Sequence, residues 1–444
     1  MKKKFSTYKK HQFPKQTIFL FGLPCIAISI FLSSSISAQT HSDSLKELGR
    51  RIEILTQEIE RIQLGEAQDI GVSVNTGFGP AASKVYQQKK SGVSIAGYGE
   101  ILFQNFAKNR EDGKSANKIN TIDFLRNVVY VGYRFSDRIV FNSEIEFEHA
   151  TTGEGAEEKG EVSVEFGYVD MLISKNVNLR TGLLLVPMGI VNLKHEPSTY
   201  FGTLRPQVEQ MILPSTWRAI GIGSYGEVIA GLNYHLYFTE GLNASEFSDA
   251  KGFRDGRQSG SEALMENLSA SGRLEFEPFT GLTIGTSFYA GKAGQGLQDS
   301  VGEIGAATTL LSAHGELNWQ GVEFRALFVR TSLNQADRLS ALAGKAIGSV
   351  MHGWYATLGY DVVPLFFDGS AHVVAPYVQY EKFNTQAKVA DGFLASKAND
   401  RSILTLGLMY KPHASVAFKV DYRNNSNAAK TGINQWNVAL NYLF

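Results

Sequence analysis

The chain has 444 residues, of which 19% are charged and 11% aromatic, with 43 basic residues, 43 acidic residues and one cysteine. Its zero formal charge gives no indication of nucleic-acid binding. A mean hydropathy of −0.12, with no long apolar run after the N-terminus, excludes a helical membrane protein. A large β-barrel has this polar composition when its interior faces water, and it forms one domain at this length.

The first 38 residues have the pattern of a cleaved secretion signal. An apolar run at 17–32 is followed by small residues at 33–38, and cleavage is expected after Ala38. The alternative, an uncleaved anchor helix, is less favoured because the run is short for a membrane span. Cys25 lies in the removed part, so the mature chain would carry no thiol into an oxidising periplasm. A cluster of lysines precedes the run: Lys2, Lys3, Lys4, Lys9, Lys10 and Lys15.

Residues 41–64 carry apolar side chains at heptad spacing, which predicts a helix with one apolar face. Because an isolated helix of this length is marginal in water, we expect it to form a short periplasmic coiled coil. The alternative is an amphipathic helix folded against a larger domain. Residues 65–91, rich in glycine, are interpreted as a linker. The heptad positions, which would carry oligomerisation, are Leu45, Leu48, Ile52, Leu55, Ile59 and Ile62.

From Val93 to the C-terminus the hydrophobic period is two, which predicts β-strands with one apolar face. Lengths near eleven residues suit tilted membrane strands. Sixteen strands are predicted, at 93–106, 121–135, 138–149, 161–174, 177–187, 217–227, 229–239, 267–277, 281–291, 305–319, 321–331, 350–362, 370–383, 400–411, 414–424 and 433–444.

The last strand ends on a bare apolar face at the C-terminus itself. An exposed apolar edge strand would aggregate in water, whereas lipid accepts it if the sheet closes into a barrel. The stretch resembles the closing strand of outer-membrane β-barrels, whose terminal aromatic residue is read by the barrel-assembly machinery. The residues that would carry this signal are Trp436, Tyr442 and Phe444.

Short and long connections alternate along the predicted strands. Two-residue turns such as 136–137 and 320–321 separate long polar loops such as 188–216 and 240–266. An even strand count with this alternation is typical of bacterial outer-membrane barrels, and sixteen strands leave an aqueous lumen. The predicted fold is therefore all-β: a sixteen-stranded antiparallel transmembrane barrel over 93–444, preceded by the periplasmic helix. Such a barrel would contact outer-membrane lipid and lipopolysaccharide and would admit small hydrophilic solutes.

The connection at 188–216 is stiff and too long to be a simple turn, since with Pro187 it carries four prolines. Here the chain resembles the phosphate-selective porins O and P, and within them the coiled-coil-bearing trimeric porins that pass dicarboxylates. The motifs that carry the resemblance are Pro187-x-Gly189-x-x-Asn192, His195-Glu196-Pro197, Arg205-Pro206-x-Val208-Glu209, Pro214-x-x-Trp217, Gly221-x-Gly223 and Gly256-Arg257-Gln258, with the N-terminal heptads.

The resemblance implies a homotrimeric channel that favours small anions, with the loop folded inward as a constriction. Positive charge in a narrow aperture concentrates anions and excludes cations. Lys194, Arg205 and Arg218 are the candidate selectivity residues, beside His195 and Glu196, and Arg254 and Arg257 are candidates for the vestibule. Alternatively, these bases hold the loop against wall carboxylates.

Strand parity places many carboxylates in the lumen, which complicates the anion hypothesis. The predicted bases on the wall that oppose these acids in charge are only four, Arg273, Arg325, Lys419 and Arg423. Opposed charges would suit general diffusion of small polar solutes instead. The predicted lumen acids are Glu100, Glu144, Glu146, Glu148, Glu161, Glu165, Glu275, Glu277, Glu323 and Asp421.

Other motifs are not interpreted as sites. Gly221-Ile-Gly223-Ser-Tyr-Gly226 matches a dinucleotide fingerprint but lacks the helix that the mechanism needs. The histidines are not spaced as metal ligands on one element. The rival class, a barrel enzyme, needs a nucleophile or paired-acid motif that the sequence does not offer. We therefore predict no enzymatic activity, no metal and no cofactor.

Overall fold

The computed structural model describes residues 76–88, 90–153, 159–367 and 369–444, all within the compact unit Asp69–Phe444. The predicted signal peptide and heptad helix, and most of the predicted linker, lie outside the described residues. Sixteen strands form one closed barrel in which each strand is antiparallel to its neighbours. This confirms the predicted all-β class and the sixteen-stranded barrel.

The barrel strands fall within a few residues of the predicted ranges. The largest difference is at β15, which continues to Val389, beyond the predicted end at 383, because its last residues are polar and carry no apolar stripe. The strands are β1 (Gly92–Phe106), β2 (Thr121–Arg134), β3 (Ile139–Glu148), β4 (Val162–Leu172), β5 (Asn178–Leu185), β6 (Arg218–Ile229), β7 (Leu232–Glu240), β8 (Leu268–Phe279), β9 (Leu282–Lys292), β12 (Ala307–Trp319), β13 (Val322–Leu333), β14 (Gly348–Tyr360), β15 (Val373–Val389), β16 (Asp400–His413), β17 (Val416–Asn427) and β18 (Gln435–Leu443).

Alternation along each strand separates an apolar outer face from a polar inner face. In β17, Phe418 is 47% exposed whereas the neighbouring Lys419 is 2% exposed. In β18, Trp436 is 54% exposed and Asn437 is fully buried. Large apolar side chains are exposed in this way around the whole barrel, which is the surface that lipid requires.

The connections carry the short helices and one small hairpin. Tight turns such as 230–231 and 320–321 lie at one end of the barrel with the longer connection 361–372, and the other long loops lie at the opposite end. No helix in the described part of the chain is long and apolar enough to cross a membrane. These elements are η1 (Lys84–Gln87), η3 (Pro197–Thr199), α2 (Gln207–Met211), η4 (Ala244–Glu246), η5 (Arg254–Gly256), β10 (Gln298–Asp299), β11 (Gly302–Glu303), α3 (Ala336–Ala343), η6 (Val363–Leu365) and η7 (Lys397–Asn399).

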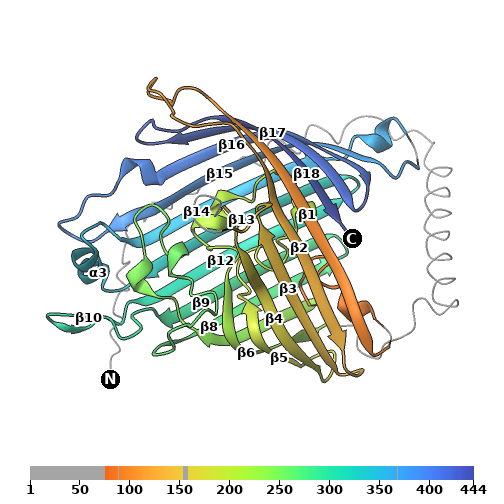
Figure 1. The fold of residues 1–444 in the computed structure, drawn as a ribbon, viewed down its shortest axis with the longest axis horizontal. Helices are drawn as coiled ribbons and strands as arrows, with labels where there is room; N and C mark the ends of the chain where they lie inside the picture. The colour runs from red at the N-terminus through yellow and green to blue at the C-terminus, as the bar shows by residue number, and fades with distance from the viewer. Residues whose placement is uncertain (1–75, 89, 154–158, 368) are drawn as a thin grey trace, which may run out of the picture. The chain divides into compact units, whose positions relative to one another are not determined.

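The barrel closes where β1 meets β18, side by side in Figure 1. Gly97 and Phe444 exchange two backbone hydrogen bonds, each of 2.9 Å. A Cβ at Gly97 would lie 2.3 Å from the Val128 carbonyl oxygen and 2.5 Å from the Phe444 ring. The seam therefore needs glycine at this position.

We expect Gly97→Ala to impair closure, because the backbone of β2 must shift to admit the methyl group, at a cost of about 1–3 kcal/mol. The measurement is the fraction of refolded protein that migrates as the compact species on an unheated gel. Gly315→Ala is the control, since a Cβ there meets only the Thr283 carbonyl oxygen, at 3.8 Å. Equal folded fractions for the two variants would contradict the prediction.

Candidate functional site: the barrel interior

Residues 186–217, between β5 and β6, fold into the barrel and are called the interior loop below. Its two ends are tied together, since the Val186 amide donates to the Trp217 carbonyl over 2.9 Å. The Asn192 side chain completes the tie. The Nδ2 group of this side chain donates to the carbonyls of Val186 (2.7 Å) and Trp217 (2.9 Å). Its Oδ1 atom accepts a hydrogen bond from the backbone amide of Trp217 over 2.7 Å. The chain between these ends is thus forced to make a closed excursion into the lumen.

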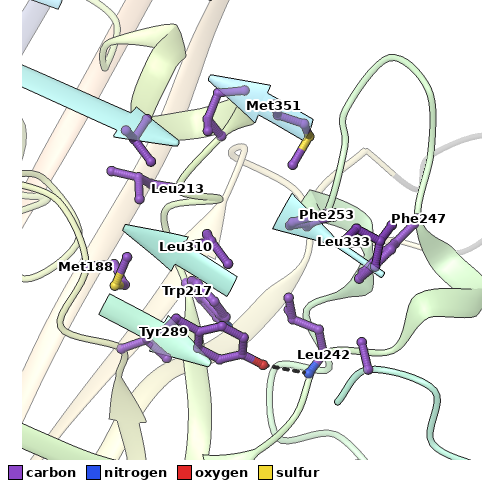
Figure 2. Close-up of a cluster of buried hydrophobic side chains, with 14 of the residues drawn as sticks. Met188, Leu213, Trp217, Leu242, Phe247, Phe253, Tyr289, Leu310, Leu333 and Met351 are labelled. Atoms are coloured by element: carbon purple, nitrogen blue, oxygen red, sulfur yellow. Dashed lines mark hydrogen bonds between the residues drawn. The ribbon is translucent and has the colours of Figure 1, made fainter. Parts of the chain in front are cut away.

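One side of the interior loop is apolar and packs on the inner wall. Met188, Leu213 and Trp217 lie in one buried cluster with wall residues that include Tyr289 of β9 and Leu310 of β12 (Figure 2). The rings of Trp217 and Tyr289 are 4.7 Å apart. Burying a side chain of this size contributes about 1.5–3 kcal/mol. The loop is therefore a packed element of the structure.

Basic side chains of the wall hold the loop by its backbone carbonyls. Lys419 is buried and donates to the carbonyls of Tyr200 (2.6 Å) and Gly202 (3.1 Å), and also to that of Pro197. Lys411 donates to the Ser198 carbonyl over 3.1 Å. Because carbonyls are neutral, these contacts position the loop without cancelling the lysine charges.

The predicted vestibule bases, Arg254 and Arg257, also hold the interior loop by its backbone carbonyls. Arg254 donates to the Gln210 carbonyl over 2.9 Å and to Ser215, and Arg257 donates to the Pro214 carbonyl over 3.1 Å and to Thr216. Burial, then the neighbouring Arg254 charge, lowers the pKa of Arg257 to about 9. The two guanidiniums are part of the loop's support.

Carboxylates of the wall accept hydrogen bonds from the loop's amides. Asp421 accepts from the Thr203 amide (2.8 Å) and Glu381 from the Val208 amide (3.0 Å). Within the loop, Glu209 accepts from the Val191 amide (2.7 Å) and from the Tyr355 hydroxyl of β14 (2.6 Å). Burial raises the pKa of Glu209 to about 7, although both hydrogen bonds favour the ionised form.

The structure brings the predicted selectivity residues into ion pairs and backbone contacts. Lys194, one-third exposed, lies 3.3 Å from Glu316 of β12, and Arg218 pairs with Glu165 of β4. Arg205 is buried and donates to the His195 carbonyl over 3.2 Å. Of the three bases, Lys194 is the one most open to solute.

His195 and its neighbour link the loop to two other parts of the barrel. The His195 Nε2 atom lies 2.9 Å from a carboxylate oxygen of Glu144. Burial lowers the pKa of His195, but the Glu144 charge outweighs it and the net shift is upward. The Glu196 carboxylate accepts hydrogen bonds from the backbone amides of Ala81 (3.2 Å) and Ala82 (2.9 Å). Burial raises the pKa of this carboxyl group.

The partners of Glu196 belong to residues 76–88, called here the N-terminal segment, which the sequence indicated as part of a plain linker. Instead it lies inside the barrel. Val85 is buried with Val140 and Leu172, and Asn142 of β3 donates to the Ala82 carbonyl over 2.8 Å. Small residues allow this fit, and in the sequence such residues resemble a flexible linker.

A buried ion pair anchors the N-terminal segment, and sequence reasoning missed it. Arg180 of β5 binds Asp170 of β4 through two hydrogen bonds of 2.7 and 2.8 Å. The Arg180 guanidinium lies 4.6 Å from the ring of Phe78, and the Tyr86 hydroxyl donates to Asp170 over 2.6 Å. Asp170 and Arg180 both lie at inward-facing strand positions. This strand parity was the signal from which the sequence could have indicated the ion pair.

The predicted lumen acids are mostly paired, and the predicted set of bases was too small. Arg126 of β2 lies between Glu100 (3.0 Å) and Glu146 (3.3 Å), and Arg325 pairs with Glu323 (2.6 Å). The prediction that only four bases face the wall acids is therefore wrong, because Arg126 and Arg180 also point inward. Glu275 pairs with Arg273, Glu148 is partly exposed, and Glu161 and Glu277 are exposed.

These features define the class of fold: a porin-like closed barrel of sixteen antiparallel strands with an interior loop. Salmonella typhi OmpF in complex with daunomycin is similar in structure, with a TM-score of 0.53, 15% identity, and coverage of 80% of this chain and 98% of that chain. The anion-selective porin from Comamonas acidovorans gives a TM-score of 0.50, 13% identity, and coverage of 80% and 100%. At these identities the likeness shows the fold alone.

A relative in sequence is an uncharacterized protein of Aquifex aeolicus (strain VF5). It is 36% identical over 379 residues, which cover 83% of this chain and 83% of that protein. The chain belongs to the same family as the Aquifex protein. No protein-family model matches the chain.

Proposed function

We propose that the protein is an outer-membrane porin that lets small hydrophilic solutes diffuse passively past the interior loop. The observation that carries the proposal is the closed sixteen-stranded barrel whose inner wall carries many acidic and basic side chains, crossed by a loop that packs on that wall. Cavities lie on both sides of the loop, of about 250 Å³ beside Leu204 and Gln207 and about 200 Å³ beside Lys194. Open space lined by polar and charged side chains suits permeation by small polar solutes.

A preference for small anions, such as phosphate or dicarboxylates, is part of the proposal. It is supported by bases whose hydrogen-bond partners are neutral carbonyls, namely Lys411, Arg254 and Arg257. Among the described residues none of the three is in an ion pair, and the carboxylates that act on them, such as Asp255 and Glu323, do so without direct contact. Their charges would raise the local anion concentration near the loop. A non-selective diffusion porin is the second candidate, favoured by the carboxylate partners of Lys194, Arg218 and Arg126.

Four further parts of the proposal rest on the sequence. The resemblance to phosphate-selective porins O and P supports a homotrimer, and the heptad stripe at 41–64 supports a short coiled coil. The N-terminal pattern supports export, and the terminal aromatics Trp436, Tyr442 and Phe444 support recognition by the barrel-assembly machinery.

The test is the reversal potential of the purified protein in a planar bilayer under a tenfold KCl gradient. We expect a chloride-favouring potential, and Lys194→Glu should move it toward cations by at least 10 mV, because a second carboxylate would face Glu316 in the aperture. Lys108→Glu is the matched control, with the same charge change on the exposed outer loop. A wild-type potential near zero would favour the non-selective porin, and absence of conductance would reject both.

A further inference from the structure

The cavity beside Leu204 and Gln207 lies on the side of the interior loop that faces the long loops. It is a pocket open to solvent between this part of the loop and β15 to β18, where solute would first meet the constriction. Its volume is about 250 Å³. Its full lining is Leu204, Gln207, Phe383, Arg401, Ile403, Arg423, Asn425, Ser426, Asn427, Gly432 and Gln435.

Two arginines supply the positive charge of this cavity. Arg401 donates to the carbonyls of Ala398 (3.2 Å) and Ala250 (3.1 Å) and to the side-chain oxygen of Asn399 (2.9 Å), all of which are neutral. None of these hydrogen-bond partners carries a charge, and the carboxylate that acts on Arg401 electrostatically is Asp249. Arg423 is 3% exposed and lies 3.3 Å from Glu381, and its Nε–H group has no hydrogen-bond acceptor.

The other polar groups of the lining are already engaged. The Asn425 side chain donates to the Ile433 carbonyl (2.8 Å), and the Gln435 side chain donates to Asn437 (2.8 Å). Ser426 donates to Glu111 over 2.6 Å at the rim. Each of the two side-chain amides thus has one N–H fixed by the protein, and the guanidiniums are the charged groups of the lining that an anion would bind.

Apolar side chains also line the cavity, although Phe383 (1% exposed) and Ile403 (5% exposed) present only a small part of their surface to it. Leu204 lines the cavity from the loop, and Phe383 and Ile403 line it from β15 and β16. Inorganic phosphate would gain nothing from this surface, whereas an apolar body beside a carboxylate would bury against it.

We propose that this vestibule cavity is a binding subsite for amphipathic organic monocarboxylates of about the size of benzoate. The carboxylate faces Arg401 and Arg423, and the apolar body lies on Leu204, Phe383 and Ile403. The inference rests on the proposed function in one respect, that solutes reach the cavity through water from the outer side. It names a solute class for the mouth of the channel and does not depend on the channel's overall ion preference.

The experiment titrates millimolar benzoate into 1 M KCl on both sides of a bilayer that holds the full-length protein, and records single-channel current. We expect a saturable reduction of current by benzoate. Inorganic phosphate, which lacks the apolar body, and benzyl alcohol, which lacks the charge, should each need at least tenfold higher concentrations. A block that is linear in benzoate, or equally strong with phosphate, would overturn the proposal.

The matched variants differ from each other by a single negative charge. Leu204→Asp places a carboxylate in the cavity, and Leu204→Asn is its neutral isostere. We expect the aspartate to weaken benzoate binding by about tenfold or more relative to the asparagine variant, by repulsion over a few ångströms. Gln207→Glu against Gln207→Met repeats the comparison if Leu204→Asp does not fold. Equal affinities within a pair would reject the subsite.

The outcomes separate the two proposals. A cation-preferring channel that benzoate still blocks saturably would reject the anion preference and support the subsite. If no current is found, saturation-transfer NMR of benzoate with the purified protein in detergent replaces the current measurement. A benzoate signal that is stronger for Leu204→Asn than for Leu204→Asp then supports the subsite, and equal signals reject it.

Discussion

Replacing Asp170 by Asn should destabilise the barrel interior by about 3–5 kcal/mol, because it leaves the buried Arg180 guanidinium without a counter-charge. Asn keeps the size of the side chain and accepts one hydrogen bond, but it carries no charge. The Tyr86 hydroxyl also loses its carboxylate acceptor, so the contact between the N-terminal segment and the wall weakens at the same time.

The measurement is the free energy of unfolding in urea for protein refolded into lipid vesicles. Asp123→Asn is the control, since the Asp123–His149 pair is partly exposed (side chains 29% and 38%) and should contribute less than about 1 kcal/mol. The double variant Asp170→Asn/Arg180→Met should recover part of the loss, because it removes the uncompensated charge. An Asp170→Asn variant no less stable than Asp123→Asn would mean that the ion pair does not anchor the segment.

The barrel could be predicted from the sequence because membrane strands repeat one simple pattern. Each strand alternates an apolar and a polar face, as at Phe418 and Lys419, and each hairpin places its neighbour next to it. Sequence neighbours are thus spatial neighbours, and the one long-range pairing, β1 with β18, follows from the absence of a free edge in lipid.

The interior could be predicted only in part, because its contacts join residues far apart in the chain. Parity places Asp421 and Lys419 in the lumen, but it does not reveal that they bind the loop at Thr203 and Tyr200. Many of these partners are backbone groups, which leave no mark in the side-chain sequence. The same limit hid the N-terminal segment, whose link to Glu196 uses the amides of Ala81 and Ala82.

The sequence left two roles open for the bases near the loop, selectivity or support of the loop, and the contacts in the structure are those of support. Arg254 and Arg257 bind four loop carbonyls between them, and Arg205 binds a fifth. Both roles are physically compatible here. A guanidinium that donates to a neutral carbonyl keeps its charge, so one residue can shape the loop and set the local field.

Raising the pH from 5 to 8 should weaken the docking of the interior loop, because burial raises the pKa of Glu209 to about 7 from 4.5. A carboxyl group whose pKa is raised by folding stabilises the docked loop fully below its ordinary value, and this contribution is lost as the pH rises through 7. The pKa values of His195 and Glu196 are also raised, so their contributions have the same sign. Arg273 opposes the shift of Glu209 and Glu316 adds to it.

Hydrogen exchange at the Val191 amide, which donates to Glu209, measures this effect directly. After correction for the intrinsic pH dependence of exchange, its protection should fall by up to about a hundredfold between pH 5 and pH 8, which corresponds to about 3 kcal/mol. Glu209→Gln is the decisive variant. A glutamine oxygen accepts the same hydrogen bonds but does not ionise, so most of the pH dependence should disappear and protection should stay high at pH 8. If wild type and variant lose protection equally, the titrating group lies elsewhere, and His195 beside Glu144 is then the next residue to replace.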